Sequence, residues 1–420
     1  MVRGVWLRIM AGLTGRPFLW LQVPTRVPHL LLALDLLPGG RRAQSAEGSV
    51  RRSLQNLCRS LCRHLCRAVA NPPKVATKAA TKYRVWSALA LLLLLTACRA
   101  VPPGKPLQRF EFSHPAMGTL VTITLYAPEP AVAKAAAAAA FKRIDALEDI
   151  MSDYQADSEL RRLCDQPFGT PVPVSTELFD ILDRAQKIAR LSDGAFDVTV
   201  GPYVRLWRFA RKRKVLPTAG EIATARAAVG WQKLRLDPYA RAVTLLVPNM
   251  RLDLGSIGKG YAADQALQIL KGRGIERALV AASGDIAVGD PPPEQHGWRI
   301  GIEAWDGVTN RVVRTVLLHN AGISTSGDTE QFIEMTGVRY SHVVDPSTGL
   351  GLTRRIQATV IGPDATTSDC LDTTVSLLGV QRGLELIRSW PHTSALVVTR
   401  DNGQRQIYVS RQFPRNAPPR

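Results

Sequence analysis

Alternation of apolar and polar positions predicts most of the strands in this chain. Residues 118–127 ("GTLVTITLYA") alternate with a period of two, as a strand with one buried face does. Residues 241–255 are interpreted as a hairpin-like pair of strands. Further strands are expected within 277–289, 298–304, 312–327, 339–344, 356–362, 394–400 and 405–411.

Apolar residues at helical spacing predict five helices between these strands. Residues 131–152 are rich in alanine, the residue most favourable to helix, and 175–194 open on a Ser-Thr-Glu start and close at a glycine. The other helices are expected at 258–275, from 365 onward, and at 380–390. Hairpins with interspersed helices favour an α+β fold built on antiparallel sheets over a doubly wound parallel sheet.

The net charge of +19 first suggests a partner that is nucleic acid or an anionic membrane. The distribution of the charge argues against nucleic acid. Residues before Cys98 hold 15 Lys/Arg and 2 Asp/Glu, whereas the chain from Cys98 onward holds 39 and 33. The body is therefore only mildly basic, and no nucleic-acid partner is expected.

A short apolar run near residue 90 has the character of a secretory signal. Lys78, Lys82 and Arg84 precede "VWSALALLLLLTAC", which gives a positive segment, a short apolar segment and small residues before a cysteine. "LTAC" resembles the bacterial lipobox, which implies that Cys98 is lipidated and becomes the mature N-terminus. We therefore expect a lipid-anchored protein of the cell envelope that faces the periplasm, in either the inner or the outer membrane.

These features divide the chain into four parts. Residues 1–97 are a leader, in which an alternative start near Val75 would leave the earlier residues as upstream translation. Residues 98–112 form a tether, 113–411 one globular domain and 412–420 a tail. The two cysteines of the domain, Cys164 and Cys370, are expected to be free and buried, although a disulfide between them stays open.

Three short motifs could carry chemistry, and each also has a purely structural interpretation. "GSIGKGYAAD" places Lys259 and several glycines before a helix, which fits either an anion site or a tight strand–helix connection. Asp285 ends an apolar strand, as a turn residue or a ligand. His342 is expected on a strand, as a structural side chain or as a general base.

The stretch "ATTSDCLDTT", residues 365–374, is the most suggestive. Asp369, Asp372 and Thr373 stand at i, i+3 and i+4, which places them on one face of a helix. Oxygen ligands favour a hard cation such as Mg²⁺. Acidic residues and threonine are equally common as caps in a first helical turn, so a capping role stays open.

Several blocks together resemble the FAD:protein FMN transferase family, the ApbE-like flavin transferases. The resemblance runs from His114 to Leu386 through "MGT", "SDGAFDVTVGP", "LDLGSIGKGYAAD", "SGDI", "GISTSGD", "YSHVVDPSTG" and "SDCLDTT", in the order of the family. It implies the ApbE-like fold and a set of site residues. FAD contacts are implied for Met117, Tyr154, Ala195, Phe196, Asp197, Asp253, Lys259, Asp285 and Val343, and Mg²⁺ ligands for Ser256, Asp369, Asp372 and Thr373.

The resemblance also implies a reaction. An FMN group would pass from FAD to a threonine of a partner protein, with AMP as leaving group and His342 as the candidate base. The acceptor would be a subunit of a membrane redox complex, which a lipid anchor would hold on the same membrane surface. The alternatives are a Mg²⁺-dependent FAD pyrophosphatase that forms FMN and AMP, and a flavin-binding lipoprotein without enzymatic activity.

Overall fold

The computed structural model describes residues 5–7, 21–23, 105–305, 310–327, 332–335, 337–401 and 404–418. Two compact units are present, Met1–Val101 and Pro102–Arg420. In the first unit, β1 (Val5–Leu7) and β2 (Leu21–Val23) form an antiparallel pair. The expected signal segment and the lipidation site at Cys98 lie outside the described residues.

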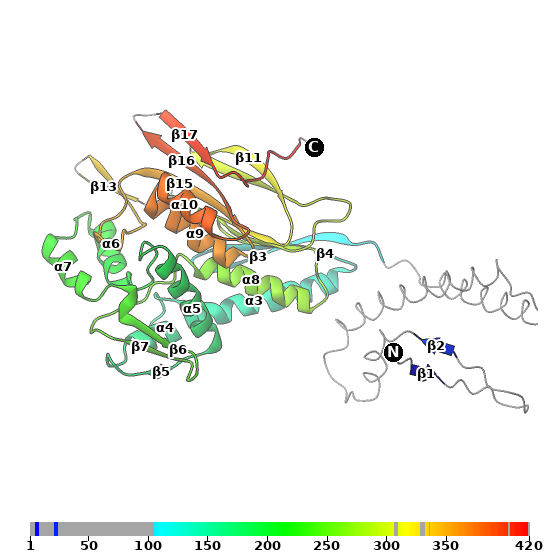
Figure 1. Ribbon diagram of the computed structural model, residues 1–420, viewed down its shortest axis with the longest axis horizontal. Helices are drawn as coiled ribbons and strands as arrows, with labels where there is room; N and C mark the ends of the chain where they lie inside the picture. The colour runs from blue at the N-terminus through cyan, green and yellow to red at the C-terminus, as the bar shows by residue number, and fades with distance from the viewer. Residues whose placement is uncertain are drawn as a thin grey trace, which may run out of the picture. The chain divides into compact units, whose positions relative to one another are not determined.

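The second unit is built on one antiparallel sheet of eight strands (Figure 1). From one edge to the other the strands are β3 (Gln108–Ala116), β4 (Thr119–Ala127), β8 (Ala278–Ala282), β9 (Asp285–Val288), β12 (Ala321–Gly327), β15 (Arg355–Gly362), β16 (Ser394–Asp401) and β17 (Gln404–Val409). Every neighbouring pair is antiparallel. The expectation of an α+β fold is confirmed.

Both faces of the sheet are covered, and successive residues of β16 show how. Leu396 and Val398 pack with the hairpin formed by β10 (Trp298–Trp305) and β11 (Asn310–Leu318). Ala395 and Val397 point the other way, toward a helical layer. Because successive side chains of a strand point to opposite faces of the sheet, this one run of apolar residues packs into two separate hydrophobic cores.

Helices α3 (Pro130–Met151), α8 (Gly258–Gly272), α9 (Ala365–Leu378) and α10 (Val380–Ser389) form that layer. Alanines of α3 make its buried stripe, which lets α8 approach closely. Helix α9 packs on β12 and β15, and nearly all of its residues are buried, polar ones included. Burying the polar side chains of a helix costs free energy unless they find partners, so the buried polar residues of α9 mark it as a candidate functional element.

The chain between α3 and α8 folds into a second group of elements, drawn in green in Figure 1. It contains the helices α4 (Glu159–Cys164), α5 (Thr176–Leu191), α6 (Gly201–Arg213) and α7 (Ala219–Ala227), the 3₁₀ turn η1 (Trp231–Lys233), and a sheet ordered β5 (Val172–Pro173), β7 (Ala242–Leu245), β6 (Leu234–Asp237). The hairpin β13 (Phe332–Met335) and β14 (Val338–Ser341) lies against α6.

The predicted hairpin over 241–255 is wrong. β7 pairs with the preceding strand β6 through a turn that ends at Arg241, whose φ is +46°. Residues beyond Pro248 form no strand and contribute one isolated bridge, from Arg251 to Val200. Pro248 has no N–H to donate to a neighbouring strand, so the second half of the predicted hairpin is a poor strand. The chain reverses instead in the turn before Arg241, and this turn lets β7 pair with β6.

Other expectations need smaller corrections. His342 follows β14 instead of lying on it. The range 277–289 is not one strand but two, β8 and β9, which turn at Ser283. Residues 108–112, assigned to the tether, begin β3, and Phe413 of the tail is buried beside the β10–β11 hairpin. The domain limits otherwise stay a prediction.

Cys164 and Cys370 are both free and buried, as expected. Burial raises the pKa of each thiol, which keeps it protonated and unreactive. No helix in the described part of the chain has the length and apolar character needed to span a bilayer.

The contact between α8 and α9 generates a first prediction. A Cβ at Gly260 would lie 2.3 Å from the carbonyl oxygen of Ala365 and 2.9 Å from Cβ of Asp369. Gly260→Ala should therefore force the helices apart and lower the free energy of unfolding by about 1–3 kcal/mol in urea denaturation. Gly272→Ala, at the end of the same helix with nothing within 4 Å, is the matched control and should be neutral or mildly stabilising. Equal effects of the two substitutions would contradict this packing.

Candidate active site

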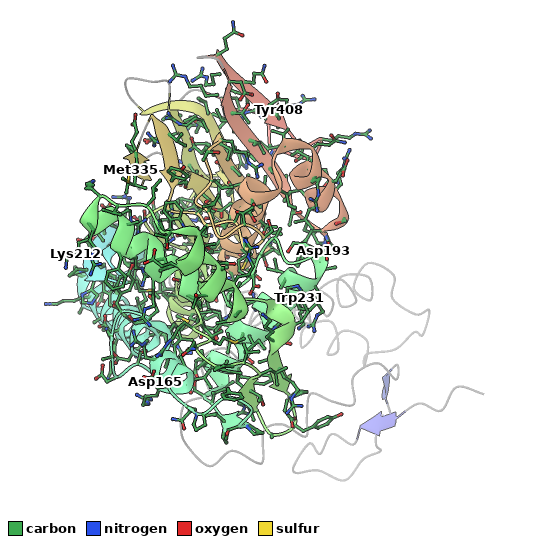
Figure 2. The ribbon with its side chains drawn as sticks, turned by 90° about the vertical axis from the view of Figure 1, so that its left-hand side faces the viewer. Asp165, Asp193, Lys212, Trp231, Met335 and Tyr408 are labelled. Atoms are coloured by element: carbon green, nitrogen blue, oxygen red, sulfur yellow. The ribbon has the colours of Figure 1, made fainter. Side chains whose placement is uncertain are left out.

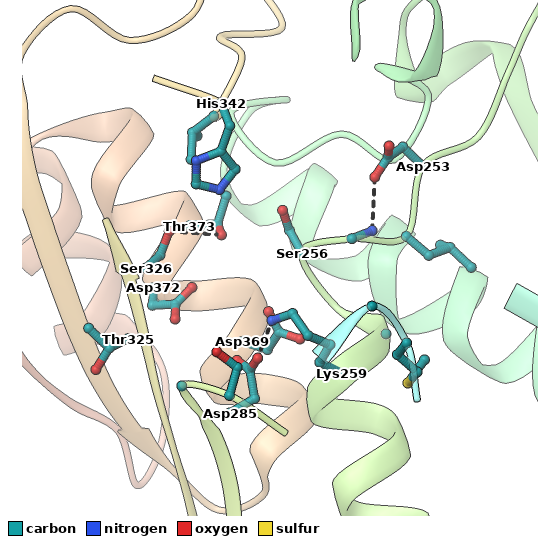
Figure 3. A pocket seen from close by; sticks show the side chains of 18 of the residues that line it. Asp253, Ser256, Lys259, Asp285, Thr325, Ser326, His342, Asp369, Asp372 and Thr373 are labelled. Atoms are coloured by element: carbon teal, nitrogen blue, oxygen red, sulfur yellow. Dashed lines mark hydrogen bonds and ion pairs between the residues drawn. The ribbon is translucent and has the colours of Figure 1, made fainter. Parts of the chain in front are cut away.

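One cavity of about 860 Å³ collects every site residue that was predicted within the domain. The lining includes Met117, Tyr154, Ala195, Phe196, Asp197, Asp253, Ser256, Lys259, Asp285, His342, Val343, Asp369, Asp372 and Thr373. These residues come from segments spread over more than half of the chain. Figure 3 shows Asp372, Thr373 and His342 on one side of the cavity and Asp253 on the other.

Helix α9 supplies the acidic side of the cavity. Asp369 and Asp372 lie one turn apart, and both side chains are buried. The backbone N–H of Gly260 donates to Asp369 over 2.9 Å. The helix begins at Ala365 with Asp364 as its N-cap. Because Asp369 and Asp372 lie beyond the first turn, capping does not explain them.

Lys259 on α8 is the cation that faces these carboxylates. Its ammonium forms an ion pair with Asp285, a residue of β9. Burial alone would lower the pKa of Lys259, but the carboxylates of Asp369 and Asp285 outweigh burial and raise it. One lysine therefore faces three buried carboxyl groups, more than its single charge can neutralise if all of them ionise.

The pKa values of Asp369 and Asp372 reflect this crowding of carboxyl groups. Burial, reinforced by Asp285, raises the pKa of Asp369 to about 7. Burial and the neighbouring Asp369 raise the pKa of Asp372 well above its ordinary value. Two like charges in a poorly hydrated site disfavour simultaneous ionisation, so this pair is poised to accept positive charge.

Ser324, a residue that sequence reasoning did not single out, bridges two of the acids. Its buried hydroxyl lies within hydrogen-bond reach of both Asp285 and Asp372. A hydroxyl has one proton to donate, so it satisfies only one of these carboxylates at a time. The residue lies within the block "GISTSG", where the alternation of β12 could have indicated an inward side chain.

The donor set fits a hard divalent cation. Oδ1 of Asp372 is buried and has no hydrogen-bond partner within the described residues. No group of three or more His, Cys, Asp or Glu side chains in that part of the chain is arranged to hold a metal ion. A cation here would need oxygen ligands beside the two carboxylates, and the hydroxyl residues Ser256 and Thr373 line the same cavity. Such an all-oxygen set suits Mg²⁺.

The orientation of α9 is fixed by a carboxylate from α8. Asp264 accepts hydrogen bonds from the backbone N–H groups of Ala365 and Thr366, at 2.9 and 2.8 Å, and from the Thr366 hydroxyl. It thereby satisfies donors that every helix N-terminus leaves open. Burial, followed by repulsion from Asp364, raises the pKa of Asp264 to about 6.

The opposite wall holds the residues expected to contact a flavin. Met117 lies in the two-residue turn between β3 and β4 with φ of +52°, and its N–H donates to Glu148 of α3 over 2.8 Å. Asp197 is buried and accepts from both the N–H and the hydroxyl of Thr199. Burial raises its pKa. These contacts fix backbone and side chains before any ligand enters.

Arg208 of α6 connects three residues of this wall and was not predicted. Its guanidinium pairs with Asp153 and with Asp253, the latter over 3.1 Å, and lies 4.0 Å from the centroid of the Tyr154 ring. Tyr154 is 75% exposed, so stacking on Arg208 is what holds its ring at the cavity.

His342 lines the cavity together with Val343, at the point where the chain leaves β14. Val343 donates its N–H to the Ser341 hydroxyl over 3.1 Å. The structure therefore brings the predicted base into the same cavity as the carboxylates, although from a loop and not from a strand.

Comparison with known proteins identifies the family of this chain. A sequence model of the ApbE family matches residues 117–397, two thirds of the chain. The chain belongs to the ApbE family. The structure resembles that of the flavin transferase ApbE from Vibrio cholerae, with a TM-score of 0.67 and 29% identity over 73% of this chain and 99% of that one. It also resembles the ApbE protein of Thermotoga maritima, with a TM-score of 0.65, 30% identity and coverage of 73% and 98%.

Sequence relatives carry a more specific name. The FAD:protein FMN transferase of Vibrio cholerae is 33% identical over 78% of this chain and 96% of its own length. The FAD:protein FMN transferase of Escherichia coli K12 is 32% identical over 64% and 78%. These relatives confirm the expected family and the expected enzyme class, a transferase.

The Asp264 cap generates a second prediction. A raised pKa means that the folded state keeps the proton of Asp264 between about pH 4 and 6, where the unfolded state loses it, so the contribution of Asp264 to stability falls as pH rises through this window. The stability advantage of the natural chain over Asp264→Asn should therefore shrink by about 3 kcal/mol from pH 3 to 7, most of it between pH 4 and 6, and then level off. Urea denaturation of both proteins at each pH measures this difference, and a constant or growing advantage would contradict the assignment.

Proposed function

We propose that this chain is a Mg²⁺-dependent FAD:protein FMN transferase that attaches FMN through a phosphoester bond to a threonine of a partner protein and releases AMP. The observation that carries the proposal is the convergence of all fourteen predicted site residues of the domain on one cavity. The names of the relatives support the same activity.

The two ends of the cavity would have different roles. Tyr154, Asp253 and the 195–197 segment would hold FAD on the wall that Arg208 organises. Lys259 would bring positive charge to the two phosphates, since its ammonium faces the carboxylate end. Mg²⁺ held by Asp369, Asp372, Thr373 and Ser256 would supply charge neutralisation at the pyrophosphate.

Transfer requires the threonine hydroxyl to lose its proton as its oxygen bonds to the FMN-side phosphorus. His342 would accept that proton. The bond that breaks joins this phosphorus to the oxygen of the AMP phosphate, and AMP leaves with that oxygen. Lys259 would stabilise the charge that develops on the departing AMP phosphate, since its ammonium faces the carboxylate end of the cavity.

The proposed cellular setting rests on the lipoprotein signal expected in the leader. Lipidation at Cys98 would hold the enzyme on the envelope membrane facing the periplasm, where an acceptor subunit of a membrane redox complex shares the same surface. Confinement of both proteins to one surface raises their effective concentration.

The carboxylate end generates a third prediction, with activity and stability as separate readouts. Asp372→Asn should lower the rate of FMN transfer at least about 100-fold, measured as in-gel flavin fluorescence of membrane proteins incubated with FAD and Mg²⁺. The same substitution removes a charge that burial disfavours, so the metal-free variant should be at least as stable as the natural chain.

Added Mg²⁺ should raise the melting temperature of the natural chain and leave that of Asp372→Asn unchanged. Asp183→Asn, a change on α5 outside the cavity, is the control and should behave as the natural chain does. Full transfer by Asp372→Asn would refute the metal assignment, and free FMN without labelled protein would favour a pyrophosphatase.

The Arg208 contacts generate a fourth prediction. Arg208→Met removes two ion pairs and the support of the Tyr154 ring, so the dissociation constant for FAD should rise about tenfold or more in a fluorescence titration. Arg205→Met, one turn earlier on the same helix, removes an exposed arginine that has no carboxylate partner within the described residues. An equal loss of FAD affinity in both variants would show that Arg208 has no special role.

A further inference from the structure

The second half of α6 and the residue after it carry an unusual density of positive charge. The segment 205–214, "RLWRFARKRK", contains six cationic side chains and no acidic one. We use the term cationic rim for five of them, Arg205, Arg211, Lys212, Arg213 and Lys214. The sixth, Arg208, is committed to Asp153 and Asp253.

The cationic rim lacks such close partners, although Arg213 acts on the exposed carboxylate of Glu221, whose pKa is lowered chiefly by its hydrogen bonds with Thr218 and to a smaller extent by Arg213. None of its five side chains forms an ion pair with a carboxylate among the residues that the structure describes, and the Arg213 guanidinium lies 5.4 Å from the Phe209 ring centroid. The C-terminal end of a helix favours one or two cations through its dipole. That effect falls off within the last turn, so it does not account for Arg205, two turns before the helix ends.

The cationic rim is continuous with the cavity, because Arg211 lines it. Burial lowers the pKa of Arg211, and the neighbouring Arg208 lowers it further, whereas Tyr154 acts in the opposite direction. A half-buried guanidinium without a carboxylate partner is partly desolvated, so an anion that reaches it would be bound favourably. The phosphates of FAD are committed to the Lys259 end under the proposed function, so this anion must come from another molecule.

We propose that the cationic rim docks an acidic segment of the acceptor polypeptide, next to the hydroxyl that enters the cavity. This inference rests on the proposed function, which requires a protein to reach the cavity. Arg211 would contact the acidic segment at the cavity wall, and Lys212 and Lys214 would extend the contact outward. Figure 2 shows the Lys212 side chain projecting away from the fold. Complementary charges at such a rim mainly raise the rate of encounter and fix orientation.

A protein segment explains the position of the cationic rim better than a lipid surface does. Its cations begin inside the cavity wall at Arg211, where a polypeptide chain can follow them and a planar bilayer cannot. A bilayer lying on this face would also obstruct the approach of the acceptor. Phe209 is 49% exposed, whereas the other aromatic side chains of α6, Tyr203 and Trp207, are buried. The helix therefore offers a bilayer only one large aromatic side chain for insertion.

The test compares two double charge reversals of equal size. Lys212→Glu with Lys214→Glu reverses the outer part of the cationic rim. Lys134→Glu with Lys142→Glu makes the same change on exposed positions of α3 that do not line the cavity. FAD affinity should match the natural chain in both variants, since neither change touches the cavity. The rim variant should melt slightly lower, because it places acidic groups at the C-terminal end of α6.

In the transfer assay with membrane proteins, the rim variant should label acceptors about tenfold more slowly at low salt, and the α3 variant at the natural rate. Salt at about 150 mM should slow the natural chain and remove most of the difference. Equal labelling by all three proteins at low salt would overturn the proposal while leaving the proposed function intact.

Binding of fluorescein-labelled poly-L-glutamate provides an arm that does not depend on catalysis. The rim variant should lose about tenfold in affinity by anisotropy, and the α3 variant should bind as the natural chain does. This arm decides the docking surface even if no transfer is seen, an outcome that would count against the proposed function alone. Loss of binding to vesicles of equal parts phosphatidylcholine and phosphatidylglycerol, with unchanged poly-L-glutamate binding, would assign the cationic rim to lipid and overturn the proposal.

Discussion

The contact between α8 and α9 is the constraint on which the candidate site depends. Gly260 lets the two backbones approach so closely that its N–H reaches Asp369, and Asp264 of the same helix caps the start of α9. Lys259, the residue before Gly260, faces the carboxylates of Asp285 and Asp369. One helix thus fixes the position of the acids, supplies their counter-charge and excludes water from them.

Burying these carboxyl groups next to one another costs free energy, and a bound cation would lower that cost. Burial and mutual repulsion push the pKa values of Asp369 and Asp372 upward, and Oδ1 of Asp372 has no partner among the described residues. A protein that only needed stability would place apolar residues here. The cost is understandable if a divalent cation completes the site, because its charge would offset that of the acids. Stability and function therefore oppose each other at this end of the cavity, as they often do at active sites.

The residues that line this cavity were predicted partly from local pattern and partly from the resemblance to the ApbE-like family. Asp369, Asp372 and Thr373 share a face through helix geometry alone, and the α+β class followed from the alternating strands. Contacts that join distant segments could not be predicted. Arg208 meets Asp253 and Tyr154 only because α6 packs beside them, and Ser324 meets Asp372 only because β12 lies under α9. The 241–255 hairpin failed for a related reason, since the true partner of β7 lay upstream.

The central claim is that the bond to phosphorus is made by a protein hydroxyl and not by water. Its most direct test is to follow AMP release and covalently bound FMN together, by chromatography and intact-protein mass spectrometry, with FAD, Mg²⁺ and the membrane acceptor fraction. The account predicts equal amounts of AMP and of protein-bound FMN, with the added mass on a threonine. AMP accompanied by an equal amount of free FMN and no labelled protein would contradict it.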